Sequence, residues 1–229
     1  MNNIDNAIAS LRNGQFVLLH DDKNRENEID MIVSAEFVCP SHIATMRKDA
    51  GGLLCVAIDN RIASSLGLVY MHDILKSMSS LNPIFDKLTA GVSPYGDKPS
   101  FSISINHRET YTGITDSDRA LTISHMATIS KNIQPDKLIN DFTNTFRSPG
   151  HVPILIASPG LLSERTGHTE LSIYLAKLAG IIPVVAICEM LDSSSFKSLS
   201  LDNALEYSKQ YNIPLINSNE LKKLYVMVD

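Results

Sequence analysis

The chain has 229 residues, and its hydrophobic fraction of 44% is enough for a sizeable buried core, which excludes a disordered or fibrous protein. Its formal net charge of −5, without a basic run, argues against nucleic acid or an anionic membrane as the main partner. Its 3 cysteines are too few and too scattered for a disulfide framework, and no stretch reaches the roughly 18 apolar residues of a membrane span. We therefore expect a cytoplasmic protein that binds neither nucleic acid nor membranes.

The N-terminal half combines a short helix with several strands. Apolar residues at helical spacing predict an amphipathic helix over 4–11, closed by Gly14. The stretch 77–99 is rich in Ser, Pro, Gly and Asn without a clear period, so we expect one long loop there. Short apolar or alternating runs predict strands over 16–19, 31–37, 53–58 and 101–105.

Helices and strands also alternate in the C-terminal half. Because no linker, repeat or low-complexity tract interrupts the chain, residues 1–229 are expected to form a single domain. The alternation indicates a sheet covered by helices and leaves the order of the strands open. Helices are expected over 121–129, 136–146, 171–178, 201–211 and 219–224, and strands over 152–157, 183–188 and 214–216.

The loop between the first two predicted strands is strongly acidic. Its segment DDKNRENEID, residues 21–30, holds five carboxylates in ten residues. Carboxylate oxygens are natural ligands of a hard divalent cation such as Mg²⁺, which takes one or two of them and keeps several waters. The segment indicates a cation site, and an exposed acidic turn is the alternative.

A second polar segment, RTGHTE at 165–170, precedes the amphipathic helix expected over 171–178. Thr169 is expected to cap that helix, and Gly167 allows its backbone to approach a ligand closely. Free N–H groups at a helix start, with Arg165 beside them, suit a phosphate, and His168 would lie at the same mouth. The alternative is a capped helix with a surface arginine.

Three further positions could carry chemistry. His151 is expected in a turn before the strand 152–157, where it could act as a general acid or base. The alternative is a loop histidine without a role. Glu189 follows a buried strand, a common ligand position in α/β proteins, although such a carboxylate can also cap or pair. The turn 112–119 serves equally as a helix entry, and Cys55 is expected to be a packed core thiol. Motifs of dinucleotide, P-loop, zincin and serine-hydrolase sites are missing.

Together these segments resemble the 3,4-dihydroxy-2-butanone 4-phosphate synthase family of riboflavin biosynthesis, in its monofunctional form. They follow the family's order and spread over most of the chain, and six matches in register are very specific. The matching stretches are DDKNRENEID (21–30), GGLLCVAI (51–58), TGITDSDRALTI (112–123), FRSPGHVPILIA (146–157), RTGHTELSIYLAKLAG (165–180) and CEM (188–190).

The resemblance implies a lyase that converts D-ribulose 5-phosphate to 3,4-dihydroxy-2-butanone 4-phosphate and formate through a metal-stabilised enediolate. Mg²⁺ would be the cofactor, and Mn²⁺ could serve. It also implies an α+β fold with a single domain, in which helices surround a mixed, mainly central sheet in three layers, and a homodimer. A different metal-dependent sugar-phosphate enzyme, such as an isomerase or aldolase, and a non-catalytic binding protein are the alternatives.

By the same resemblance, the site residues fall into four groups. The metal ligands would be Glu26 and His168, and the catalytic residues would be His151 and Glu189. The substrate would contact Arg25, Glu26, Asp30, Arg165, Thr166, Gly167, His168, Thr169 and Glu189. The residues expected to line the site more loosely are Glu28, Cys55, Thr112 and Asp116.

Overall fold

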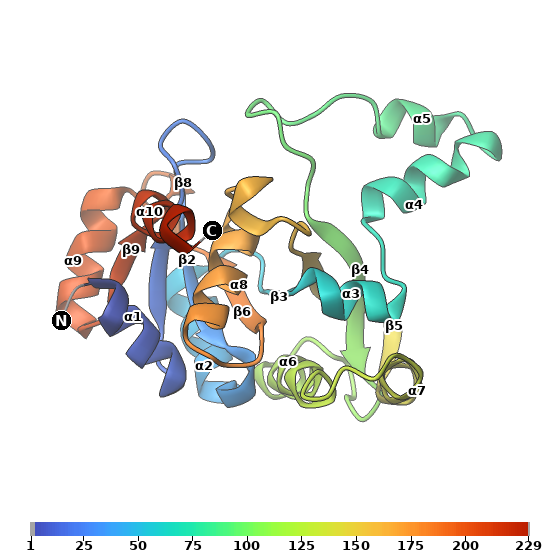
Figure 1. Cartoon of the computed structure of the whole chain (residues 1–229), viewed down its shortest axis with the longest axis horizontal. Coiled ribbons are helices and arrows are strands. Elements are labelled where there is room, and N and C mark those ends of the chain that lie inside the picture. The colour runs from blue at the N-terminus through green and yellow to red at the C-terminus, as the bar shows by residue number, and fades with distance from the viewer. Residues whose placement is uncertain (1–2, 229) are drawn as a thin grey trace.

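The structure, a computed structural model that describes residues 3–228, is built on a mixed sheet of seven strands in the order β4-β5-β3-β6-β2-β1-β9 (Figure 1). Strand β3 runs parallel to β5 and β1 parallel to β9, whereas the other neighbouring pairs are antiparallel. The strands are β1 Val17–His20, β2 Ile29–Ser34, β3 Cys55–Ile58, β4 Phe101–His107, β5 Phe146–Ile156, β6 Val184–Glu189 and β9 Leu215–Asn217. A two-stranded ribbon of β7 Leu191–Asp192 and β8 Lys197–Ser198 follows β6.

Helices cover both faces of the sheet. On one face lie α1 Asn3–Arg12, α8 His168–Leu178 and α10 Ser218–Val228. On the other lie α2 Pro40–Thr45, α3 Asn60–Leu66, α6 Asp116–Ile129, α7 Pro135–Thr145 and α9 Leu201–Tyr211. This confirms the expected three-layer arrangement of helices around a mixed sheet. A bilayer-crossing helix is not found within residues 3–228.

Strand β6 shows how the pattern of the sequence builds the two cores. Its residues are apolar without interruption up to Cys188, because helices cover both sides of the strand. Successive side chains point to opposite faces. Val185 and Ile187 therefore pack under α8, whereas Ala186 and Cys188 enter the core beneath α6. Glu189 ends the strand at the rim of the sheet, as expected.

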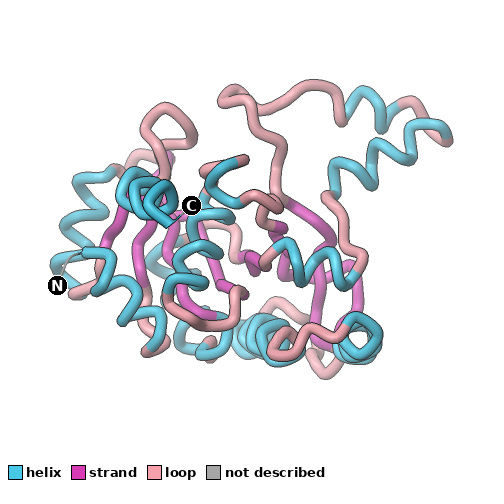
Figure 2. The backbone as a smooth tube through the Cα atoms, viewed as in Figure 1, coloured by secondary structure: helices cyan, strands magenta, loops and turns pink. Residues whose placement is uncertain are grey.

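The stretch 77–99 is not one long loop, which corrects the sequence prediction. It includes the end of α4 Met71–Ser77, a 3-10 turn at Met78–Ser80 and α5 Ile84–Leu88. These helices form an arm that extends away from the sheet, and an extended loop leads from α5 back to β4 (Figure 2). None of the arm's helices contains a buried residue. The apolar residues Met71, Ile74, Leu75 and Met78 nevertheless have helical spacing, so the sequence carries a signal for α4 that the prediction overlooked.

Two further elements differ from the prediction. Residues 35–37 form a 3-10 turn after β2 rather than the end of a strand. Strand β5 begins at Phe146, so His151 lies inside it and not in a turn before it. The ladder with β4 pairs Asn106 with Arg147 and Ile105 with Val152, and the extra residues between these pairs form a bulge. A bulge accommodates the Pro-Gly pair that had indicated a turn.

Candidate functional site

The rim of the sheet beneath α8 carries two acidic residues side by side. Asp30 of β2 lies directly opposite Glu189 of β6, so both side chains point to the same face. The Leu53 backbone N–H donates to Glu189 Oε2 at 2.7 Å, and the Gly52 N–H donates to the Glu189 carbonyl at 3.0 Å. A side chain on Gly52 would clash with Glu189, because a Cβ there would lie 2.5 Å from Oε2. The segment before β3 therefore fixes the Glu189 carboxylate.

His168, the first residue of α8, contacts the acidic loop, although 142 residues separate it from Glu26. Its Nδ1 lies 3.2 Å from Glu26 Oε2, and its Nε2 lies 3.1 Å from the Glu28 carbonyl oxygen and 3.8 Å from Asp30 Oδ1. The residue that caps α8 is Gly167, with extended backbone, and not Thr169 as predicted. The helix cap thus lies two residues earlier than predicted, and His168 is the first residue of the helix.

Three ligand atoms form a candidate metal site at this contact. Oxygens of Asp21 and Glu26 and a ring nitrogen of His168 lie within 4.8 Å of one another. Asp21 was not among the predicted ligands, although it stands in the acidic loop. It also shapes that loop, because its carboxylate accepts hydrogen bonds from the backbone N–H groups of Glu26 at 3.1 Å and Glu28 at 3.0 Å.

The pKa values at this contact reflect a buried excess of negative charge. Burial raises the pKa of Asp30 to about 7, and the charges of Glu189 and Glu26 add to the effect. Burial opposes the charged form of His168, but Asp30 and Glu26 outweigh it and raise the pKa of His168 to about 9. The hydrogen bonds that Glu26 receives from His168 and Tyr95 overcome its own burial and lower its pKa to about 2. A divalent cation is suited to neutralise such a cluster.

A cavity of about 420 Å³ adjoins the carboxylate cluster and is lined by Arg25, Arg165 and Thr166. Arg25 connects the two, because its Nη1 lies 3.1 Å from Asp21 Oδ2 and 2.8 Å from Glu26 Oε2. Arg165 Nη1 is held at 2.5 Å by a buried carboxylate of α8, that of Glu170. Two guanidinium groups in one cavity provide the paired N–H donors that a phosphate prefers.

Asp97, in the loop before β4, bridges these two arginines and was missed in the sequence. Its Oδ2 accepts a hydrogen bond from Arg25 Nε at 2.8 Å and lies 3.5 Å from Arg165 Nε. The Tyr95 ring lies 4.8 Å from the Arg25 guanidinium carbon. Gly167 lies directly beneath them, since a Cβ there would lie 2.3 Å from Arg165 Nη1 and 2.8 Å from Arg25 Nη2 and would displace the two guanidinium groups. The buried Arg25 Nη2 has no hydrogen-bond partner among the described residues.

His151 and Glu189 point to the same face of the sheet but lie on strands that are not neighbours. Strand β3 separates β5 from β6, so the two residues are two strand spacings, or roughly 10 Å, apart. His151 is exposed, and its Nδ1 lies 3.1 Å from the side-chain nitrogen of Asn106 on β4. Asn106 was also missed in the sequence, where it is one polar residue of an alternating strand.

The residues predicted to line the site are not equally close to it. Cys55 lies on β3 beneath α8, and burial together with the Glu189 charge raises the pKa of its thiol. The Thr112 carbonyl is 3.4 Å from the Asn106 side-chain nitrogen. Asp116 instead opens helix α6, where its carboxylate forms an ion pair with Arg47 at 2.9 Å.

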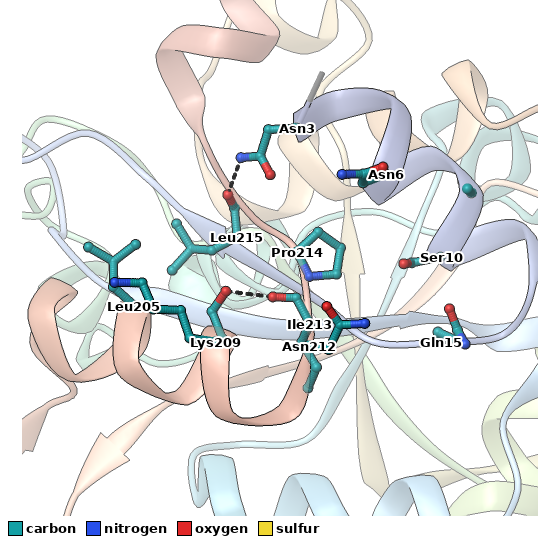
Figure 3. A pocket seen from close by; sticks show the side chains of 12 residues that line it. Asn3, Asn6, Ser10, Gln15, Leu205, Lys209, Asn212, Ile213, Pro214 and Leu215 are labelled. Carbon is teal, nitrogen blue, oxygen red and sulfur yellow. Dashed lines mark hydrogen bonds between the residues drawn. The ribbon is translucent and has the colours of Figure 1, made fainter. Parts of the chain in front are cut away.

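A larger cavity lies elsewhere and has a different chemistry. It measures about 590 Å³ and lies between α1, α9 and the start of β9 (Figure 3). Its wall consists mainly of neutral amide, hydroxyl and aliphatic groups, with Lys209 as the charged member. The acidic loop and α8 do not contribute to it. The chemistry of the carboxylate cluster thus belongs to the smaller cavity around Arg25 and Arg165.

A mixed sheet with helices on both faces, carrying a carboxylate and imidazole cluster beside an arginine-lined cavity, defines a class of α/β protein with a candidate metal and anion site. The family model of 3,4-dihydroxy-2-butanone 4-phosphate synthase matches residues 5–224. The chain belongs to this family, whose enzymes act in riboflavin biosynthesis. A 3,4-dihydroxy-2-butanone 4-phosphate synthase of Methanothermobacter thermautotrophicus is 44% identical over 223 residues, covering 97% of this chain and 96% of that protein.

Solved structures agree with this assignment. The 3,4-dihydroxy-2-butanone 4-phosphate synthase of Candida albicans superposes with a TM-score of 0.74 at 30% identity and covers 98% of each chain. Another structure of such a synthase, described as a complex with two magnesium ions, has a TM-score of 0.78 at 28% identity. The match covers 99% of this chain and 97% of that one. The fold predicted from the sequence is thus that of the family.

Proposed function

We propose that this protein is a Mg²⁺-dependent lyase that converts D-ribulose 5-phosphate to 3,4-dihydroxy-2-butanone 4-phosphate and formate. The observation that carries the proposal is the contact of Glu26 with His168, 142 residues apart, beside the cavity of Arg25 and Arg165. A metal-binding cluster and an anion-binding cavity in contact suit a phosphorylated sugar. The roles that the resemblance implies for the site residues are part of this proposal.

The described donor set fits a divalent ion. Asp21, Glu26 and His168 each offer one ligand atom, and two of the three donors are the carboxylates that Mg²⁺ favours. The buried Asp30 Oδ1 has no hydrogen-bond partner among residues 3–228, so a nearby positive charge would stabilise it. A bound Mg²⁺ would supply positive charge for the adjacent oxygens of an enediolate, which develop charge as the reaction proceeds. Mn²⁺ could supply the same charge.

The phosphate of the substrate would bind between Arg25 and Arg165. Thr166 lines the same cavity, and the start of α8 adds the partial positive charge of a helix N-terminus. Asp97 would compete with the phosphate for the two arginines, because its carboxylate pairs with both guanidinium groups. The metal site at Glu26 and the phosphate site at Arg25 share one ion pair, which fixes the distance between them.

Glu189 and His151 would serve the proton-transfer steps at the carbon skeleton of the substrate. The spacing of two strands leaves room for a five-carbon sugar between them. The Leu53 N–H holds the Glu189 carboxylate in place, as a general base requires. Proton abstraction at one carbon and loss of a hydroxyl as water are the two steps that call for such groups.

A formate assay tests the proposed function. We expect formate from D-ribulose 5-phosphate in the presence of Mg²⁺, no formate in EDTA, and recovery when Mg²⁺ or Mn²⁺ is added back. An isomerase or aldolase would consume the sugar phosphate without releasing formate. A non-catalytic protein would bind it without turnover, and either result would reject the proposal.

Replacing Asp97 by Asn is expected to strengthen the binding of inorganic phosphate about tenfold, because it removes a negative charge that accepts a hydrogen bond from Arg25 and pairs with Arg165 at 3.5 Å. Calorimetric titration in Mg²⁺ measures the affinity. Glu164→Gln is the matched control, since Glu164 is an exposed residue of the same cavity wall. Equal effects of the two substitutions, or weaker binding in Asp97→Asn, would contradict a competing role for Asp97.

We also propose that the protein works as a homodimer in the cytoplasm. The exposed apolar residues of the arm, among them Leu81, Ile84 and Leu88, provide surface for such an interface. Sedimentation in the presence of Mg²⁺ tests the assembly. An active monomer would reject the homodimer while leaving the proposed reaction intact.

A further inference from the structure

Asn106 lies on β4 opposite the bulge of β5, and its amide contacts both the backbone and the ring of His151. Its side chain is 4% exposed. Oδ1 accepts a hydrogen bond from the His151 backbone N–H at 2.8 Å, and Nδ2 lies 3.1 Å from His151 Nδ1. We propose that Asn106 is a positioning residue that keeps the neutral His151 ring protonated on Nε2 and not on Nδ1. This inference rests on the proposed function, because it specifies what His151 does there.

The orientation of the Asn106 amide follows from its neighbours. A backbone N–H can only donate, so the atom that faces the His151 N–H at 2.8 Å must be the oxygen. The opposite side of the amide faces the Thr112 carbonyl at 3.4 Å, which can only accept. In a flipped amide, the NH₂ group would face the His151 backbone N–H, which is also a donor, and the oxygen would face the Thr112 carbonyl, which is also an acceptor. Both amide atoms lie near His151 Nδ1, but Nδ2 is closer, at 3.1 Å against 3.4 Å for Oδ1, and Oδ1 already accepts the backbone hydrogen bond.

Neighbouring residues keep the amide in this position. Gly113 packs directly on it, since a Cβ at Gly113 would lie 2.1 Å from Asn106 Nδ2. The Gly113 N–H in turn donates to Asp118 Oδ2 at 2.9 Å, which ties the turn to helix α6. Asn106 thus cannot rotate freely away from the ring, and the geometry around His151 persists without a ligand.

The tautomer decides what the exposed side of the ring can do. With Nδ2 of Asn106 donating to Nδ1, the hydrogen of neutral His151 lies on Nε2, the nitrogen turned away from Asn106. His151 then acts as a neutral hydrogen-bond donor to a substrate oxygen and not as a base through Nε2. Proton abstraction from carbon accordingly belongs to Glu189.

Nitrogen NMR of the ¹⁵N-histidine-labelled protein tests this assignment without any turnover. The His151 signals are identified by their loss in His151→Gln. Above the titration range of the ring, we expect Nδ1 with the shift of an unprotonated nitrogen and Nε2 with that of a protonated one. A proton on Nδ1, or an equal mixture of the two forms, would overturn the proposal, whatever the outcome of the formate assay.

Asn106→Asp provides the second measurement. A carboxylate can only accept, so the proton is expected to move to Nδ1 and the pKa of His151 to rise by at least about one unit. The signals of His72, outside this network, serve as the internal control. In the formate assay, kcat should fall about tenfold with a shifted pH profile and a little-changed KM. An unchanged tautomer and pKa in a folded Asn106→Asp protein would overturn the positioning role. Should Asn106→Asp not fold, the wild-type spectrum decides alone.

Discussion

Loss of either proposed metal ligand should lower formate production at least about 100-fold, or roughly 2.7 kcal/mol of transition-state stabilisation. The test substitutions are His168→Ala and Glu26→Gln. Each removes one of the three ligand atoms that lie within 4.8 Å of one another, and Glu26→Gln also weakens the ion pair with Arg25. The assay follows formate release at saturating Mg²⁺, and calorimetry follows Mg²⁺ affinity, which should fall in parallel.

The controls remove the same chemical groups elsewhere on the molecule. Glu109→Gln changes an exposed carboxylate after β4, and His125→Ala changes a partly exposed histidine of α6. Both should retain formate release and Mg²⁺ affinity within about twofold, as surface substitutions usually do. Full activity in His168→Ala would remove the observation on which the proposed function depends. Loss of activity in the control variants would show that the assay reports on folding and not on the site.

Replacing Gly150 by Ala is expected to destabilise the protein by about 3 kcal/mol, at the upper end of the cost of overpacking. A Cβ on Gly150 would lie 2.0 Å from the Ile105 carbonyl carbon and 2.3 Å from the Asn106 backbone nitrogen. Since these are backbone atoms of the paired strand, they cannot yield as a flexible side chain does. For a chain of this length, the loss corresponds to a melting temperature about 6–12 °C lower.

Urea unfolding followed by circular dichroism measures this loss of stability. Gly91→Ala is the matched control, because its Cβ would meet nothing within 4 Å although its φ is +89°. The control therefore carries only backbone strain, with an expected cost of about 1 kcal/mol. If the two variants unfold at the same urea concentration, the close contact between the β5 bulge and β4 is not what stabilises this part of the sheet.

Most strands of the sheet could be predicted because each is an apolar or alternating run that can be recognised within a few residues. An uninterrupted apolar run identifies β6 between helices, and the capping hydrogen bond from the Asp118 N–H to Thr115 Oγ1 explains why α6 begins earlier than its apolar residues suggest. In the arm, the prediction overlooked the helical spacing of Met71, Ile74 and Leu75 in α4, whereas the 5 residues of α5 are too few to show a period.

The candidate site divides in the same way. Glu26 and His168 stand in segments whose composition alone indicated a site, an acidic loop and a polar helix start. In the structure, His168 Nδ1 lies 3.2 Å from Glu26 Oε2. Asp97 and Asn106 occupy an ordinary loop and an ordinary strand. Their importance comes from partners 72 and 45 residues away, and no local pattern reports such a pairing.

The sequence by itself determined the chemical groups available to this protein and the elements that present them, because side-chain type and hydrophobic period act over a few neighbouring residues. Only the tertiary structure decided which groups meet. The sheet register sets Asp30 opposite Glu189, and the bulge in β5 turns His151 onto Asn106. Such contacts depend on how distant segments pack together, and packing is a property of the whole folded chain.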